Sequence, residues 1–289
     1  MPELPEVEVV KRSLINKIQN SIIKAIKIND GRLRYKIDRN QIKKIIGLKF
    51  KKISRRSKYL LFYFNSDVIM LVHLGMTGKF FFINQKKAKY KTSFYYNINY
   101  DKDKKHDRII FNLSNNEKLI YNDIRKFGFI KFINRLNLDQ NIHLKHLGPE
   151  PLSTKFNIGY FKNYIKGKER TIKDLLMDQK FISGLGNIYV NEILFFSGVR
   201  PTKKIKKLTN SEIQKIIKFS KKIITKAIIL GGSSIKDFSS GSGKKGLFQQ
   251  HFSVYGKKGE NCSNVKCLGK IKKIVIANRA SFFCSKCQK

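Results

Sequence analysis

Hydrophobic residues follow two different periods along this chain, and the change of period separates a β-rich part from a helical part. From about Glu6 to Gln19, apolar residues recur every three or four positions with acids in the first turn, which predicts a helix. Between about Ile22 and Ile133 the chain contains short β-rich runs separated by Asn, Asp, Gly or Ser. About eight such runs predict an antiparallel sandwich or barrel. The runs are IIKAIKI, LKFKKI, YLLFYF, VIMLVHL, FYYNINY, RIIFNL, KLIYN and FIKFI.

The pattern changes again near residue 134. The stretch from Asn134 to Thr154 contains Gly-Pro-Glu-Pro at 148–151 and is interpreted as a linker. Beyond it the apolar period becomes helical, most clearly from Thr209 to Leu230, and two glycines at 231–232 predict the end of that helix. The Gly- and Ser-rich stretch from Ser233 to Gly246 predicts a mobile loop. The remaining residues form a small module that holds all the cysteines.

The most informative feature of the composition is its excess of positive charge. The 289 residues include 61 Lys and Arg against 20 Asp and Glu, a formal net charge of +41. So large an excess predicts a polyanionic partner, nucleic acid first and an anionic membrane surface second. Lys, Asn and Ile are abundant throughout, so the sign of the charge carries more weight than its size. No uncharged apolar run reaches the roughly 18 to 20 residues of a membrane span. The acidic N-terminus does not resemble a signal peptide, so we expect a cytoplasmic protein without membrane association.

The four cysteines form two closely spaced pairs, Cys262 with Cys267 and Cys284 with Cys287. Two such pairs supply the thiolates of a tetrahedral zinc site, in a segment too short to be held by apolar burial alone. Two disulfides or four unrelated thiols are the alternatives, and the clustering favours the metal. We expect one structural Zn²⁺, because four thiolates leave no open position for catalysis. A hairpin held in this way would present Arg279, either as a phosphate clamp or as an ordinary solvated arginine.

The N-terminus offers an unusual nucleophile. Methionine before proline is normally trimmed, so the mature chain should begin at Pro2 with a free secondary amine. An α-amino group has a pKa of roughly 8, which leaves a neutral fraction near pH 7. A secondary amine that attacks an anomeric carbon gives an iminium ion. Helical geometry would place Glu3 beside the amine to move protons and Glu6 near the helix start. The alternative is a helix N-terminus whose proline and acids serve only the helix.

Seven blocks of sequence give these features a common context. Together, in this order and over essentially the full length, they resemble the bacterial formamidopyrimidine-DNA glycosylases, which are bifunctional DNA glycosylases and abasic-site lyases. The blocks are MPELPEVEVVKRSL at the start, RRSKYLL at 55–61, HLGMTGKF at 73–80, KHDR at 105–108, NDIRKFG at 122–128, LLMDQKFISGLGNIYVNEILF at 175–195, and the terminal cysteine module. The first cysteine pair departs from the family pattern, which has Cys-x2-Cys where this chain has Cys-x4-Cys.

The resemblance implies an α+β multidomain fold. Residues 1–133 would form an N-terminal antiparallel β-sandwich that includes the N-terminal helix, and 134–154 the linker. Residues 155–247 would form a helix-two-turns-helix domain with a lesion-recognition loop, and 248–289 a C-terminal zinc-finger β-hairpin. The loop around 233–246 would close over the damaged nucleotide, or it is a plain linker.

The resemblance also assigns roles. Pro2 matches the nucleophile and Schiff-base residue, Glu3 the proton donor in base excision, and Glu6 a supporting acid. Lys58 matches the lysine credited with proton donation in β-elimination, and Arg279 the finger arginine that grips phosphate and assists δ-elimination. DNA contacts are implied for His106, Arg125, Lys168 and Asn187. The residues that match those inserted where the damaged nucleotide leaves the helix are Met76, Arg125 and Phe127; without the resemblance, Met76 and Phe127 would be ordinary core residues.

The implied function is base-excision repair. The enzyme would remove 8-oxoguanine and formamidopyrimidines from double-stranded DNA and cut the abasic site by β,δ-elimination. It would act as a monomer, without a catalytic cofactor, in the bacterial cytoplasm at the nucleoid. One alternative is an endonuclease VIII-type glycosylase for oxidised pyrimidines, although the PELPEVE opening, HLGM and DIRKFG favour the purine-specific branch. The other is a non-catalytic zinc-containing protein that binds DNA or RNA through its basic surface.

Overall fold

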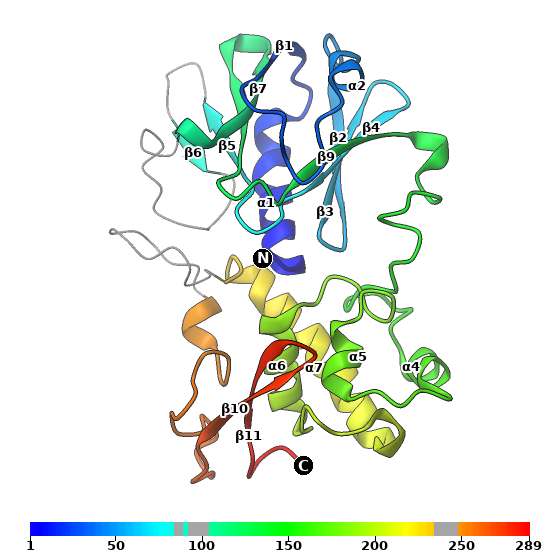
Figure 1. Ribbon diagram of the computed structural model, residues 1–289, viewed down its shortest axis with the longest axis vertical. Helices are drawn as coiled ribbons and strands as arrows, with labels where there is room; N and C mark the ends of the chain where they lie inside the picture. Colours follow the sequence, from blue (N-terminus) through cyan, green and yellow to red (C-terminus); the bar gives the residue numbers. More distant parts are fainter. Residues whose placement is uncertain (84–88, 92–103, 234–247) are drawn as a thin grey trace. The chain divides into compact units, whose positions relative to one another are not determined.

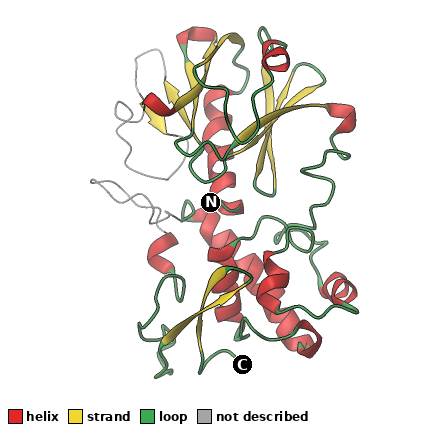
Figure 2. Ribbon diagram, in the orientation of Figure 1, coloured by secondary structure: helices red, strands yellow, loops and turns green. Residues whose placement is uncertain are grey.

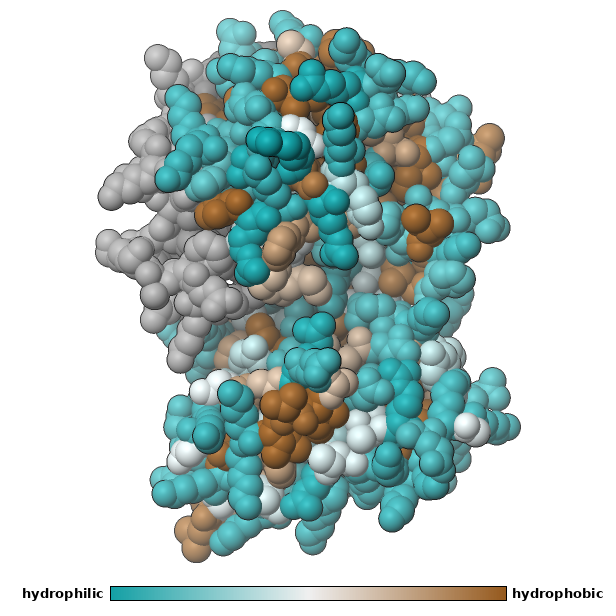
Figure 3. Space-filling model, in the orientation of Figure 1, coloured by the Kyte–Doolittle hydropathy of each residue, from teal (hydrophilic) through white to brown (hydrophobic). Residues whose placement is uncertain are grey.

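The computed structural model describes residues 1–83, 89–91, 104–233 and 248–289 (Figure 1). The chain divides into two compact units. The first contains Met1–Lys145 and the segment that begins at Gly231, and the second contains His146–Leu230 and Phe248–Lys289. Hydrophilic side chains predominate on the described surface in Figure 3, and hydrophobic ones form separate patches, as the high charge of the chain leads us to expect. Within the described part, none of the helices combines the length and the apolar character that crossing a membrane requires.

Two antiparallel sheets form the first unit (Figure 2). The five-stranded sheet has the order β1-β7-β8-β5-β6 and the four-stranded sheet the order β2-β3-β4-β9. The predicted antiparallel sandwich is therefore confirmed. The strands are β1 (Ile23–Ile28), β2 (Phe50–Arg56), β3 (Tyr59–Phe64), β4 (Val68–His73), β5 (Lys79–Ile83), β6 (Lys89–Lys91), β7 (Asp107–Leu113), β8 (Lys118–Asn122) and β9 (Phe129–Asn134).

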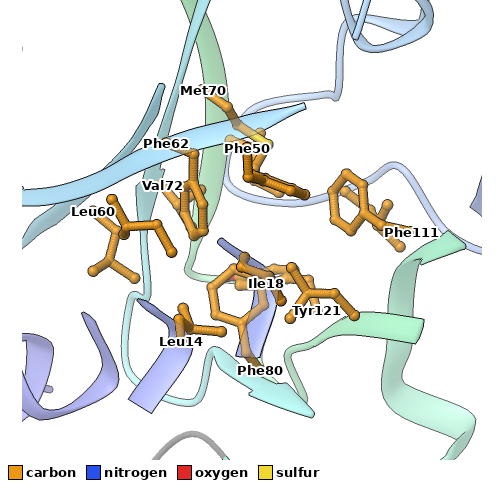
Figure 4. Packing of buried hydrophobic residues seen from close by; sticks show 14 of the residues in the cluster. Leu14, Ile18, Phe50, Leu60, Phe62, Met70, Val72, Phe80, Phe111 and Tyr121 are labelled. Atoms are coloured by element: carbon orange, nitrogen blue, oxygen red, sulfur yellow. The ribbon is translucent and has the colours of Figure 1, made fainter. Parts of the chain in front are cut away.

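The core of the first unit forms around helix α1 (Leu4–Ile18). Apolar residues of α1 at the predicted spacing of three and four are fully buried and join the inner faces of both sheets. Figure 4 shows Leu14 and Ile18 among large side chains from the two sheets. Side chains on the other face of the four-stranded sheet form a smaller apolar cluster. This second cluster contains Leu61, Ile69, Leu71, Phe129 and Ile133.

The structure adds elements that the sequence pattern did not predict. Strand β5 was not among the predicted runs, although its KFFFI sequence is almost wholly buried. The short helix α2 (Arg39–Lys43) was also missed; Asp38 caps it by accepting hydrogen bonds from two backbone N–H groups, each at 2.9 Å. The predicted run FYYNINY lies outside the described residues.

The second unit contains four helices in its described part and a two-stranded hairpin. The helix predicted over Thr209–Leu230 is α7, which Thr209 and Glu212 start with a reciprocal capping box. The hairpin of β10 and β11 lies against α6 (Figure 1). These elements are α4 (Ile158–Ile165), α5 (Ile172–Met177), α6 (Asn187–Ser197), α7 (Asn210–Ile229), β10 (Ile271–Ile276) and β11 (Arg279–Cys284). Single 3-10 turns span Lys104–His106, Ser114–Asn116, Arg135–Asn137, Ile205–Lys207 and Phe248–His251.

Candidate functional site

Pro2 lies directly before the first turn of α1, and its side chain is buried. Met1 is 42% exposed, so the residue that must be removed to free the Pro2 nitrogen stands in solvent. The carboxylates of Glu3 and Glu6 are both buried, each residue at 3% exposure. Glu6 Oε2 accepts the backbone N–H of Glu3 at 2.8 Å, which fixes the start of the helix. Glu3 directly follows Pro2 in the chain, and a buried carboxyl group at such a position is of the type that moves protons in catalysis.

Glu6 also binds a segment far away in sequence. Its Oε1 atom accepts hydrogen bonds from the backbone N–H of Ser233 at 2.8 Å and from the Ser233 hydroxyl at 3.0 Å. Gly232 packs so closely that a Cβ atom there would lie 3.0 Å from Glu6 Oε1. Ser233 is the first residue of the predicted Ser233–Gly246 loop, and the rest of that loop lies outside the described residues.

Lys58 occupies the two-residue turn that joins β2 to β3, and the residue is 6% exposed. Ser57, the first residue of the turn, has a positive φ of 56°. Arg55 ties this hairpin to α1, because its guanidinium donates to Glu8 Oε2 at 2.9 Å and to the Ser57 carbonyl at 2.9 Å. Burial by itself would raise the pKa of Glu8, but hydrogen bonds from Lys11, Arg55 and Arg12 lower it overall. Lys58 is therefore held on a rigid turn attached to α1.

His73 ends β4 within an aromatic cluster. Its ring stacks on Phe129 with centroids 5.4 Å apart, and it lies 5.0 Å from the ring of Tyr59. Burial lowers the pKa of His73 to about 4, and the positive charges of Lys58, Arg34 and the N-terminus act in the same direction. The neutral ring accepts the backbone N–H of Gly75 at its Nδ1 atom, 3.1 Å away. His73 therefore supports the turn that carries Met76.

Met76, Arg125 and Phe127 lie on two segments of the first unit. Met76, half-buried, lies in the turn at 74–78 between β4 and β5. Arg125 and Phe127 lie in the loop at 123–128 between β8 and β9; both are exposed, Phe127 at 45%. The Arg125 guanidinium covers the Phe127 ring, with its central carbon 4.7 Å from the ring centroid. Phe127 is not a core residue in this arrangement, which leaves its ring available to a partner.

His106 lies beside this loop, in the 3-10 turn that precedes β7. Its Nδ1 atom is 3.4 Å from the Arg108 guanidinium, and its carbonyl accepts the backbone N–H of Asp123 at 3.1 Å. Arg108 also reaches Asp30, whose pKa is lowered chiefly by hydrogen bonds from Arg32 and then from Lys126. His106 is thus bonded to Asp123, the first residue of the loop that contains Arg125.

In the second unit, Asn187 is the first residue of α6 and joins that helix to the hairpin. Its Nδ2 atom donates to the Ala280 carbonyl at 3.0 Å, and its Oδ1 atom accepts from Lys173 Nζ at 2.7 Å. Arg279, next to Ala280, is exposed at the start of β11. Of residues 278–281 in this hairpin, Asn278 and Arg279 are exposed, whereas Ser281 is fully buried. Only the first part of that stretch is presented to solvent.

Lys168 is exposed just after α4 and is folded back onto the same helix. Its Nζ atom donates to the Tyr164 carbonyl and lies 3.8 Å from the centroid of the Tyr164 ring. A lysine near a helix C-terminus compensates the carbonyls that have no helical partner. In this structure Lys168 has the geometry of a helix cap.

The four cysteines converge at the end of the second unit. Their sulfur atoms all lie within 4.8 Å of one another, with 3.7 Å between Cys262 and Cys287 and 3.6 Å between Cys267 and Cys284. A tetrahedral zinc with Zn–S bonds of about 2.3 Å separates its sulfur ligands by roughly 3.8 Å. The set of four thiolates and their spacing therefore fit a metal ion, and the wider Cys-x4-Cys pair does not prevent this convergence.

Two family profiles match the chain. The formamidopyrimidine-DNA glycosylase N-terminal domain matches residues 1–130, and the formamidopyrimidine-DNA glycosylase H2TH domain matches residues 147–239. The formamidopyrimidine-DNA glycosylase of Rickettsia massiliae is 39% identical over 288 residues, which cover 100% of this chain and 97% of that protein. The chain belongs to the formamidopyrimidine-DNA glycosylase family. The enzyme of Roseobacter denitrificans is 35% identical and matches over 100% of both chains.

Solved structures agree with this family. A single-site mutant of the Lactococcus lactis enzyme, in complex with Fapy-dG containing DNA, has a TM-score of 0.85 and 35% identity over 100% of both chains. The Lactococcus lactis enzyme with abasic-site DNA has a TM-score of 0.84 and 35% identity over 99% of both chains. The fold of this formamidopyrimidine-DNA glycosylase family member therefore matches that of DNA-bound relatives over its whole length.

Sequence reasoning missed several polar residues that support the site of this glycosylase family member. Thr77 and Asp123 stand inside two of the sequence blocks and bond to each other. Asn191 accepts the backbone N–H of Phe282 at 2.8 Å, and Glu192 accepts three backbone N–H groups at 253–255. A polar residue at a buried position of an apolar helix was the available signal for Asn191 and Glu192. Ser233 was predicted only as the first residue of a Gly- and Ser-rich loop, and not as a partner of Glu6.

Proposed function

We propose that this protein is a base-excision repair DNA glycosylase that removes oxidised purines from double-stranded DNA and then cleaves the abasic site. The observation that carries the proposal is the burial of Glu3, the N-cap residue that follows Pro2, and of Glu6 in the first turn of α1. Relatives that match over their full length are named formamidopyrimidine-DNA glycosylases, and neighbouring structures hold Fapy-dG or abasic-site DNA. The net charge of +41 suits a phosphate-rich partner. We place the protein, as a monomer, at the nucleoid of the bacterial cytoplasm, where such DNA lies.

The proposed reaction begins when removal of Met1 frees the Pro2 nitrogen. The amine attacks C1′ of the damaged nucleotide, the glycosidic bond breaks, and Glu3 supplies the proton that the departing base needs. The resulting iminium ion lowers the pKa of the C2′ proton. Loss of that proton breaks the bond from C3′ to the 3′ phosphate, and a second elimination breaks the bond to the 5′ phosphate. Water then hydrolyses the iminium and releases Pro2.

Other side chains serve these steps by position and charge. Glu6 orients the first turn of α1, and Lys58 donates a proton in β-elimination from its rigid turn. Arg279 grips a phosphate and assists δ-elimination. His106, Arg125, Lys168 and Asn187 contact DNA, and Met76, Arg125 and Phe127 occupy the space that the everted nucleotide leaves. Lys168 would have to leave its cap on Tyr164 to do so.

The metal of the cysteine cluster is proposed to be a single Zn²⁺ held by Cys262, Cys267, Cys284 and Cys287. Four thiolates complete its coordination, so its role is to hold the β10–β11 hairpin in place. We keep the division into 1–133, 134–154, 155–247 and 248–289 as a proposal about functional domains.

Borohydride trapping with abasic-site duplex DNA tests the proposed nucleophile. Wild-type protein should form a covalent adduct, whereas protein with a blocked N-terminus should not, and Pro2→Gly, which replaces the secondary amine with a primary one, should form less. Pro5→Ala is the matched control, because it changes a proline of the same helix and leaves the terminal amine intact. A duplex panel tests the substrate: release of 8-oxoguanine and formamidopyrimidine should exceed release of thymine glycol. An adduct that survives blocking of the N-terminus would contradict the mechanism, and a preference for thymine glycol would contradict the substrate class.

A further inference from the structure

The residues proposed to occupy the space of the everted nucleotide lie on two segments separated in sequence. Met76 comes from the turn at 74–78, and Arg125 and Phe127 come from the loop at 123–128. For these side chains to enter DNA together, the two segments must keep a fixed geometry. The strands on either side of the two segments are paired, His73 with Phe129 and Lys79 with Asn122, so the ends of the segments are held together. The segments themselves lie between strands, and within them other contacts must fix the geometry.

One buried side chain joins the two segments. Asp123 is 0% exposed, and its two carboxylate oxygens have different partners. The Thr77 hydroxyl donates to Oδ1, and the backbone N–H of Gly128 donates to Oδ2 at 2.8 Å. The Thr77 oxygen in turn accepts the backbone N–H of Arg125 at 2.9 Å. Thr77 therefore donates to Asp123 at the start of the loop and accepts from Arg125 in its middle, although 46 positions separate Thr77 from Asp123.

The backbones of the two segments also touch. Gly75 has a positive φ of 62°, and a Cβ atom there would lie 2.3 Å from the nitrogen of Gly128 and 2.3 Å from the carbonyl carbon of Phe127. Arg108, itself 6% exposed, supports the loop by donating to the Asp123 carbonyl at 2.8 Å. The two backbones therefore lie in close contact at Gly75, beside the hydrogen bonds of Thr77.

We infer that Thr77 and Asp123 are positioning residues that make the turn at 74–78 and the loop at 123–128 a single rigid wedge. The wedge presents Met76, Arg125 and Phe127 to the DNA together, and the inference rests on the proposed function. We call the hydrogen bonds that Thr77 and Asp123 make between the two segments the bridge. Because of the bridge, DNA binding does not have to order two independent segments. The entropy cost of that ordering would otherwise reduce the binding free energy that is available to evert the nucleotide. Hydrogen bonds in a buried site are costly to break, because the separated donor and acceptor have no water to bind instead.

Thr77→Val tests the inference, because valine keeps the shape of threonine and lacks the hydroxyl. Thr77→Ser, which keeps the hydroxyl, is the matched control. A duplex with 8-oxoguanine next to 2-aminopurine reports eversion by fluorescence and base release by single-turnover excision. Trapping on a single-stranded abasic oligonucleotide reports the amine without eversion. The valine variant should slow both the fluorescence change and excision by about tenfold, and leave single-strand trapping within about twofold of wild type. The serine variant should match wild type in all three assays.

The outcomes separate this inference from the proposed function. A wild-type protein that neither traps nor excises would overturn the proposed function. If wild type is active and Thr77→Val everts and excises at the wild-type rate, the bridge has no positioning role. If Thr77→Val loses single-strand trapping as well, the hydrogen bonds of Thr77 stabilise the fold of the whole first unit and have no specific effect on the wedge. This result would also overturn the inference.

Discussion

Glu6 and Ser233 are joined by two hydrogen bonds although 227 positions separate them in sequence. The same carboxylate accepts the backbone N–H of Glu3 through its other oxygen. Three donors therefore converge on one side chain, and a carboxylate accepts all of them because both of its oxygens are acceptors. The first turn of α1, next to Pro2, is thereby tied to the start of the predicted loop at 233–246.

Glu6→Gln should weaken this connection, because the amide nitrogen of glutamine cannot accept a hydrogen bond. One donor loses its acceptor, which should cost about 1–3 kcal/mol of stability and slow base excision at least about tenfold. Ser233→Ala loses only the hydroxyl contact, and its cost should be nearer about 1 kcal/mol. Urea unfolding and single-turnover excision measure the two effects. Equal values for Glu6→Gln and wild type would show that the carboxylate has no such role.

His73 predicts a dependence of stability on pH. The unfolded chain has a histidine pKa near 6.5, whereas burial and nearby positive charges lower the folded value to about 4. The unfolded state therefore binds the proton first as the pH falls. The stabilisation is complete above pH 6.5 and is lost as the pH falls toward 4, in total about 3 kcal/mol.

Urea unfolding of wild type and His73→Asn between pH 7 and pH 4.5 checks this dependence. Asparagine does not titrate, and its carboxamide oxygen can still accept the Gly75 N–H. The variant should be less stable at pH 7, because it loses the stacking on Phe129, but it should lose less further stability on acidification. His143, whose pKa is also lowered by burial, is common to both proteins. Parallel pH profiles would contradict the assignment to His73.

Gly128 should not tolerate a side chain. A Cβ atom at this position would lie 1.9 Å from the Tyr121 hydroxyl and 2.8 Å from the His73 carbonyl. Gly128→Ala should therefore destabilise the first unit by about 1–3 kcal/mol, as overpacking of buried sites does. Gly159→Ala is the matched control, because this glycine of α4 has its nearest neighbour at 3.4 Å and alanine favours helix. Thermal unfolding should show opposite signs for the two changes, and a neutral Gly128→Ala would refute the packing.

Glu192 should contribute to the stability of the second unit. Its carboxylate accepts backbone N–H groups of Ser253, Val254 and Tyr255 at 2.8 to 3.0 Å, while burial raises its pKa against the effect of these donors. Glu192→Gln replaces one acceptor with a donor, so we expect a loss of about 1–3 kcal/mol. Glu260→Gln, which removes an exposed contact of 3.9 Å to Lys257, should cost less than about 0.5 kcal/mol. Similar unfolding midpoints for the two variants would be inconsistent with this difference.

Metal removal should weaken binding to duplex DNA but should not prevent covalent trapping by Pro2. One zinc per protein should be measured by elemental analysis, and chelation should weaken duplex binding at least about tenfold because the β10–β11 hairpin loses its support. Trapping on a single-stranded abasic oligonucleotide should persist, since Pro2 belongs to the other unit. Cys267→Ser should reproduce the effect of chelation, and Ser263→Ala, in the same turn, should not. Tight duplex binding by metal-free protein would contradict the role of the hairpin.

The fold could be predicted from the sequence where a periodic pattern met a clear stop. Helix α7 is an example, because its apolar stripe is bounded by the Thr209 cap and by Gly231. Strand β5 was missed because three consecutive phenylalanines give no alternation, a consequence of burial on both sides. Helix α2 is too short for a period to appear, so only its Asp38 cap could have indicated it.

The site was less accessible to sequence reasoning than the fold. The cysteine pairs carry their own spacing, and their convergence could be predicted. The contacts of Glu6 with Ser233 and of Thr77 with Asp123 could not, because each joins residues more than 40 positions apart and depends on the tertiary fold. Asn187 was assigned from its position in a motif, while the structure shows its side chain bonded to Lys173 and Ala280. Motifs therefore identified the residues but not the bonds that orient them.

Among the described residues, one apolar cluster surrounds α1 in the first unit, and another forms around Phe195, Ile271 and Phe282 beside the cysteines of the second unit. Cooperativity in melting extends only as far as a shared interior. A calorimetric scan should therefore resolve more than one heat-absorption peak, and added chelator should displace only the peak that belongs to the cysteine-bearing part. A single melting temperature would be a misleading description of variants in either half.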